Sequence, residues 1–131
     1  MEAAVERFAA IGFLLTGISH LAAPRALVEL FMGFAERGRP GSLMNAAVHL
    51  PIGIMVAAFH PVWSGPGIVL TLIGWSLVAK STFYIAFPDW GVAQLRRFAT
   101  LERVGHFRIA GVAAVLLGLY CAWLSVGAPW T

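Results

Sequence analysis

A pattern that occurs twice constrains this chain most: an apolar stretch ends at a proline, an amphipathic segment with arginines follows, and a second apolar stretch returns. The first copy turns at Pro24 and the second at Pro88. Each apolar stretch is long enough for a helix that crosses the roughly 30 Å hydrocarbon core of a bilayer. The sequence therefore predicts an all-α integral membrane bundle of four transmembrane helices, in two helical-hairpin halves that each carry a short interfacial helix.

Composition also indicates a chain that is embedded in a membrane. Charged residues make up 11% of the 131 residues and hydrophobic residues 60%. A soluble domain carries about 25% charged residues, so this chain lacks the charge to cover its own surface in water. We expect a single membrane domain over residues 1–131. Its spans are predicted at roughly 4–23, 42–60, 67–87 and 104–126, with ends placed to within about 2–4 residues.

The arginines predict the orientation of the chain. They gather in the link between the first two spans and in the link between the last two, whereas the turn from His60 to Pro66 carries no Lys, Arg, Asp or Glu. The positive-inside rule places both links in the cytoplasm, so both termini and that turn face the non-cytoplasmic side, with Trp63 and Trp130 in the outer aromatic belt. We expect a multi-pass protein of the bacterial cytoplasmic (inner) membrane with lipid as a partner. The net charge of +3 suits anionic headgroups rather than nucleic acid.

Rows of small residues predict where the spans approach each other closely. Gly53 belongs to such a row in the second span, and Gly118 belongs to one in the fourth. Small side chains let helix backbones come near each other and allow hydrogen bonds between helices. The same packing favours association with other membrane subunits or with further copies of the chain.

Ionisable residues inside the spans are the candidate functional residues, because each is expensive to hold in a membrane. The candidate ligand-binding set comprises His20, Asn45, His49, Lys80, Tyr84 and His106. The predicted topology puts His20, His49, Lys80 and His106 in the cytoplasmic half. There they either share one pocket or reach the headgroups separately, Lys80 by extending its aliphatic stem. His60, by contrast, is expected at the outer end without a partner.

The sequence shows few signatures of catalysis, metal binding or haem binding. It has no nucleophile motif, no phosphate-binding glycine loop and no paired carboxylates, so we expect no catalytic residues. No His, Cys and carboxylate cluster has the spacing of a metal site. A haem would need two histidines on facing helices at one depth, and His20 with His106 is the pair that fits. We expect no bound cofactor, with a quinone or a haem as the alternatives.

Several segments resemble those of small, uncharacterised bacterial four-span membrane proteins. Such proteins show a His-Asn-x-Trp turn, a Gly-Trp span and a Lys-Gly pair before a closing proline. The matching segments here are His60-Pro-Val-Trp63-Ser-Gly, Thr71-Leu-Ile-Gly-Trp75, Lys80 and Phe87-Pro88. The chain departs from the pattern at Pro61, which replaces the Asn, and at Ser81, which replaces the Gly. This resemblance implies a fold but no activity.

The first span carries a second resemblance. The run Phe13-Leu-Leu-Thr-Gly17-Ile-Ser-His20-Leu-Ala-Ala-Pro24 is similar to the first helix of DoxX-like membrane proteins. The similarity covers this one helix. It implies a quinone-linked role or a role beside a redox partner.

Three functional hypotheses follow from these patterns. The first is a non-catalytic membrane protein that acts as an accessory subunit or a homo-oligomeric component. The second is a binding or transport protein that holds a quinone, a lipid headgroup or a small anion in a cytoplasmic-side His/Lys pocket. The third is a haem-binding membrane redox protein.

Overall fold

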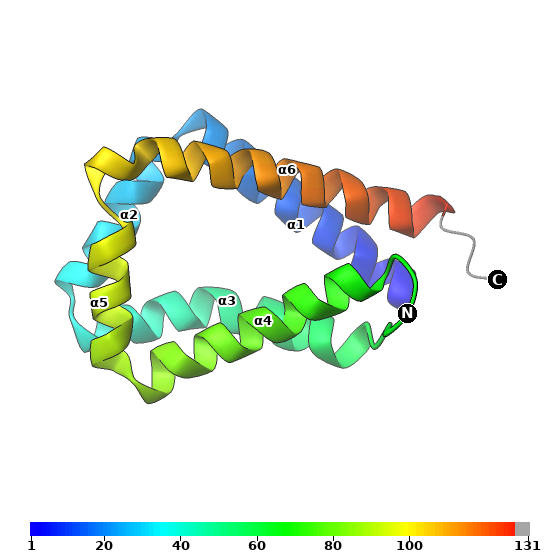
Figure 1. Cartoon of the computed structure of the whole chain (residues 1–131), viewed down its shortest axis with the longest axis horizontal. Coiled ribbons are helices and arrows are strands. Elements are labelled where there is room, and N and C mark those ends of the chain that lie inside the picture. Colours follow the sequence, from blue (N-terminus) through cyan, green and yellow to red (C-terminus); the bar gives the residue numbers. More distant parts are fainter. Residues whose placement is uncertain (128–131) are drawn as a thin grey trace.

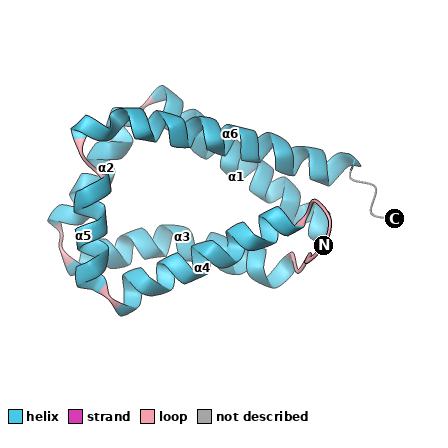
Figure 2. Cartoon of the chain, in the orientation of Figure 1, coloured by secondary structure: helices cyan, strands magenta, loops and turns pink. Residues whose placement is uncertain are grey.

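The computed structural model describes residues 1–127, and these form helices joined by short turns, without a strand (Figures 1 and 2). The helices are α1 (Glu2–Ala22), α2 (Pro24–Glu36), α3 (Arg39–Phe59), α4 (Ile68–Ala86), α5 (Pro88–Phe98), the short 3₁₀ helix η1 (Leu101–Arg103) and α6 (Val104–Gly127). Four segments, α1, α3, α4 and η1 with α6, are long and apolar enough to cross a membrane. The predicted all-α membrane bundle is confirmed. Trp130, predicted in the outer belt, lies outside the described residues.

The two prolines create the short helices α2 and α5. Pro24 and Pro88 are the first residues of these helices, where a missing N–H and a fixed φ cost nothing. The residues before them, Ala23 and Phe87, are non-helical, with φ of −136° and −127°, because a following proline disfavours the α conformation. Each long helix therefore ends at the proline and a new one starts in another direction, which confirms the predicted short helices.

The long helices pair across the two halves of the chain. α1 packs along α6, and α3 packs along α4. The sequence analysis expected a hairpin within each half, but α2, with 13 residues, is roughly 20 Å long and holds the inner ends of α1 and α3 apart. In the repeat, α1 of the first half corresponds to α4 of the second, and α3 corresponds to α6. The α1–α6 pair is therefore equivalent to the α4–α3 pair. The repeat seen in the sequence is thus also present in the packing.

Glycines lie at the closest contacts within each pair. A Cβ on Gly53 of α3 would come within 2.9 Å of the Leu77 Cβ of α4. A Cβ on Gly118 of α6 would come within 2.9 Å of the backbone nitrogen of Leu14 in α1. Real Cβ atoms do not approach other atoms so closely, so both positions require glycine. The predicted close packing at Gly53 and Gly118 is confirmed.

The two helix pairs meet at one end of the molecule and separate toward the other (Figure 1). We name the end with the start of α1 and the turn 60–67 the outer end, and the end with α2 and α5 the inner end, after the predicted orientation. A buried cluster closes the outer end; it contains Val5, Ala9, Ala10, Val56, Leu70 and Cys121. At the inner end α2 and α5 lie across the gap between the pairs. The two pairs therefore diverge from the outer end toward the inner end.

Candidate functional site

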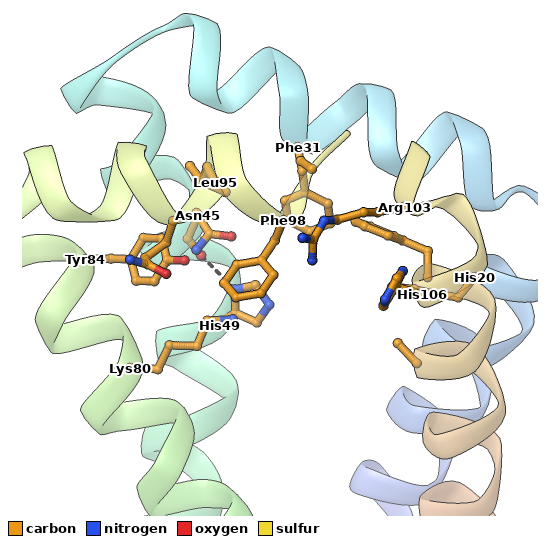
Figure 3. A pocket seen from close by; sticks show the side chains of 14 residues that line it. His20, Phe31, Asn45, His49, Lys80, Tyr84, Leu95, Phe98, Arg103 and His106 are labelled. Atoms are coloured by element: carbon orange, nitrogen blue, oxygen red, sulfur yellow. Dashed lines mark hydrogen bonds between the residues drawn. The ribbon is translucent and has the colours of Figure 1, made fainter. Parts of the chain in front are cut away.

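A cavity of about 450 Å³ occupies the space between the pairs near the inner end (Figure 3). Its size falls within the range of small-molecule binding sites. All six candidate residues of the sequence analysis line it, although they come from α1, α3, α4 and α6. The lining consists of His20, Phe31, Asn45, His49, Lys80, Tyr84, Gln94, Leu95, Phe98, Ala99, Arg103, His106, Phe107 and Ala110. The structure thus brings these polar groups together, and whether they bind a ligand stays a prediction.

One wall of the cavity belongs to α3 and α4. His49 donates its Nδ1–H to the backbone carbonyl oxygen of Asn45, one turn earlier, at 2.8 Å. This bond assigns the tautomer and leaves Nε2 of His49 free to meet a ligand. Lys80 extends from α4 toward His49 (Figure 3), and its Nζ lies 5.8 Å from the centroid of the Tyr84 ring. The wall therefore offers one imidazole nitrogen and one ammonium group.

The facing wall belongs to α1 and α6 and repeats the same arrangement. His20 donates its Nδ1–H to the carbonyl oxygen of Thr16 at 2.7 Å, so its Nε2 is free as well. The ring of His20 stacks on Phe107, with 5.8 Å between ring centroids and an interplanar angle of 14°. His106 stands on the same wall (Figure 3). The cavity therefore has histidines on both sides.

The His20 and His106 pair does not frame a space for haem. Both residues belong to helices that touch, since a Cβ on Gly111 of α6 would lie 2.8 Å from the Cβ of His20. A porphyrin needs a gap between its two axial histidines, and these backbones leave none between α1 and α6. Among residues 1–127, no group of three or more His, Cys, Asp or Glu side chains is arranged to hold a metal ion.

The sequence analysis missed the part of the lining that comes from α5 and η1. Leu95 and Phe98 form the apolar face of α5 and cover the end of the cavity. Arg103 of η1 also lines it, although the sequence analysis used this residue only for orientation. The available signal was the amphipathic pattern of α5, which was assigned to the membrane surface alone.

An ion pair braces the inner end outside the cavity. Nε and Nη2 of Arg39, at the start of α3, donate to the two carboxylate oxygens of Asp89 in α5, each at 2.9 Å. This hydrogen-bonded guanidinium lowers the pKa of Asp89 below its ordinary value of 3.8. Both side chains are largely exposed, so the pair orients α5 more than it stabilises the fold.

His60 is not alone at the outer end, and the prediction that it lacks a partner is wrong. It is fully buried together with Glu6 of α1 and Thr71 of α4. Its Nε2 lies 3.2 Å from Oε1 of Glu6, and its Nδ1 lies 3.1 Å from Oγ1 of Thr71. We call these residues the outer triad. They link α1 to the other helix pair where the two pairs meet.

The hydrogen bonds of the outer triad determine where its protons lie. Thr71 Oγ1 is 2.8 Å from the carbonyl oxygens of His60 and Val62, so its hydrogen is donated to them and it accepts from Nδ1–H of His60. Nε2 of His60 and Oε1 of Glu6 then share a single proton. Whether that proton makes an imidazolium and a carboxylate or a neutral pair, the net charge is zero. Neutrality lets the triad remain buried.

Comparison with known proteins identifies no relative. Neither protein-family models, nor curated proteins, nor solved structures match this chain. The resemblances described for the sequence therefore stay predictions.

Proposed function

We propose that this chain is a membrane binding protein that takes up a lipid-soluble small molecule with a polar head group. The observation that carries the proposal is the inner cavity, in which His20 and His49 present free Nε2 atoms from facing walls. Both rings are half-buried, and inside a membrane a polar atom without a hydrogen-bond partner is costly. Groups that are held in place yet unsatisfied suit a ligand that supplies the missing partners.

The shape of the molecule supports entry of the ligand from the bilayer. α2 and α5 cover the inner end of the cavity, while α1 meets α3 only weakly along its length. The openings between the helix pairs therefore face the hydrocarbon region. Apolar side chains, among them Phe31, Phe98 and Phe107, would surround the ligand's apolar part while its head group meets the histidines.

The proposal places the cavity in the cytoplasmic half of a bacterial inner membrane. The support is the arginine-rich links at the inner end and the absence of charge in the turn 60–66, which the positive-inside rule assigns to opposite sides. Both termini then face away from the cytoplasm. The accessory-subunit role and assembly with other subunits or copies stay predictions.

Filling the cavity tests the proposal. Ala110 of α6 lines the cavity, whereas Ala113 on the same helix is exposed and does not. Photoreactive diazirine-labelled dodecanoate and dodecanol would be added to protein in phosphatidylcholine nanodiscs, and the cross-linked peptides mapped by mass spectrometry. We expect at least one probe to label cavity-lining peptides in the unmodified chain and in Ala113→Trp, and to lose that labelling in Ala110→Trp. Equal labelling of all three proteins would overturn the proposal.

A further inference from the structure

Two cations line the inner cavity without a carboxylate beside them. The lining contains Lys80 and Arg103 and no Asp or Glu. Lys80 Nζ lies near the ring of Tyr84, and the guanidinium carbon of Arg103 lies 5.9 Å from the centroid of the Phe98 ring. Within residues 1–127, neither cation has a carboxylate oxygen within 4.0 Å. The cavity is thus positively charged, and its cations contact aromatic faces.

The internal repeat contrasts Arg103 with an equivalent arginine that has a counter-ion. As many residues separate Arg39 from Arg103 as separate Pro24 from Pro88, so the two arginines occupy equivalent positions. Arg39 is neutralised by Asp89 of the other half. By the same spacing, the residue equivalent to Asp89 is Arg25, which cannot neutralise Arg103 and pairs instead with Glu29. Arg39 of the first half therefore has a carboxylate partner, whereas the equivalent Arg103 of the second half has none among the described residues.

A cation that faces a largely apolar cavity without a counter-ion is stabilised when an anion accompanies it. We propose that the inner cavity binds an acyl-chain amphiphile with an anionic oxygen head group, a carboxylate or a phosphate, that Arg103 and Lys80 neutralise. This inference rests on the proposed function and narrows its ligand class. An uncharged head group would leave both cations unpaired, and a cationic one would be repelled.

The histidines suit the same head group. Because Nδ1–H of His20 and of His49 is donated to the backbone, each ring meets the ligand through Nε2. A neutral ring accepts the remaining O–H of a phosphate monoanion, and a protonated ring donates to a carboxylate or phosphate oxygen. Either arrangement holds one proton between ring and ligand. The apolar lining takes the first part of the acyl chain, and the rest extends into the bilayer.

Spin-labelled stearic acid measures this binding. The protein would be reconstituted in phosphatidylcholine bilayers, and the motionally restricted fraction of a chain-nitroxide stearate followed by electron paramagnetic resonance. Competitors of equal chain length are dodecanoate, dodecyl phosphate, dodecanol and dodecyltrimethylammonium. We expect about one tightly held stearate per chain, displaced by one or both of the anionic competitors, with dodecanol and dodecyltrimethylammonium at least tenfold weaker. Displacement by dodecanoate alone or by dodecyl phosphate alone identifies the head group.

Arg97 supplies a matched control for Arg103. Its guanidinium carbon lies 5.8 Å from the same Phe98 ring, but Arg97 does not line the cavity. We expect Arg103→Gln and Lys80→Met each to weaken stearate binding about tenfold, Arg103→Lys to restore most of it, and Arg97→Gln to leave it unchanged. Unaltered thermal unfolding of the variants separates lost binding from lost folding.

Failure of this inference differs from failure of the proposed function. If dodecanol displaces stearate as well as dodecanoate does, or if Arg103→Gln and Arg97→Gln behave alike, the anionic head group is overturned while the cavity still binds an amphiphile. If no probe is held in the cavity, both the inference and the proposed function are overturned.

Discussion

His49, in the middle of α3, and His60, at its C-terminal end, have opposite surroundings. Both ring nitrogens of His60 are hydrogen-bonded to buried side chains, Glu6 and Thr71. His49 uses one nitrogen for its own helix and turns the other toward a cavity. A histidine whose bonds are all satisfied holds helices together, whereas one with a free nitrogen can bind something else. Both residues are histidines, so the residue type does not distinguish the two roles. The distinction lies in whether a ring nitrogen lacks a hydrogen-bond partner.

The largest effect is expected at the outer triad. Glu6→Leu removes the partner of a fully buried histidine and leaves Nε2 of His60 without a hydrogen bond. The expected loss is about 3 kcal/mol of unfolding free energy, the lower end of the range for breaking a buried pair. Reversible unfolding in mixed detergent micelles, titrated with dodecyl sulfate, measures it. Glu2→Leu, at an exposed position of the same helix, serves as the control, and equal stability of the two variants would show that the triad is not a structural link.

A smaller loss of unfolding free energy is expected for Glu6→Gln, which keeps the shape of the outer triad. Glu6→Gln supplies an amide N–H that donates to Nε2 of His60, so a proton still lies between the two side chains. We expect a loss of about 1 kcal/mol by the same unfolding titration. A loss as large as that of Glu6→Leu would mean that the pair needs full charges, and the neutral arrangement would be excluded.

A substitution in the inner cavity should impair ligand binding and leave the stability of the fold almost unchanged. His49→Leu removes one side-chain hydrogen bond to a carbonyl that the helix itself already satisfies, and it adds apolar surface to a membrane span. Unfolding free energy should therefore change by no more than about 0.5 kcal/mol, while stearate binding weakens. If His49→Leu lost as much unfolding free energy as Glu6→Leu, His49 would have a structural role like that of His60.

The smallest effect concerns the exposed ion pair at the inner end. Arg39 lowers the pKa of Asp89 in the folded chain, so its stabilisation is fully present above the unfolded value near 3.8 and is lost as the pH falls through the lower folded value. Arg39→Gln should raise the pKa of Asp89 toward 3.8, as followed by ¹³C NMR of the carboxyl group. High salt should shift it in the same direction. An unchanged pKa in Arg39→Gln would show that the two side chains do not pair in solution.

Much of the fold follows from short-range patterns in the sequence. Apolar length predicts the four spans, and Pro24 and Pro88 mark the ends of two of them because proline cannot continue a helical ladder. Depth in the membrane also brings His20, His49 and Lys80 to the same level, which is why the candidate residues line one cavity. These features depend on local sequence or on distance from a span end.

The pairing of the helices could not be predicted in the same way. Glu6 and His60 are 54 residues apart, and their contact depends on the two helix pairs meeting at the outer end. Glu6 resembled an ordinary charge near a chain end, and no local pattern marks its burial. Arg103 was likewise indistinguishable from the other arginines of the inner end, because only the structure shows that Arg39 forms an ion pair with Asp89 and that Arg103 does not form an equivalent pair.

Two thiols in one chain test the contrast between the ends most directly. Cys121 is the only cysteine and is buried in the cluster at the outer end, while Ala110→Cys places a second thiol in the inner cavity. Folded protein in nanodiscs would be treated with two methanethiosulfonate reagents that partition into the bilayer, one anionic and one cationic, and analysed by intact mass. The account predicts one label per chain, at position 110, added faster by the anionic reagent. Labelling at Cys121 first, or no label at position 110, would contradict an outer end that is closed and an inner cavity that is positively charged and can be reached from the bilayer.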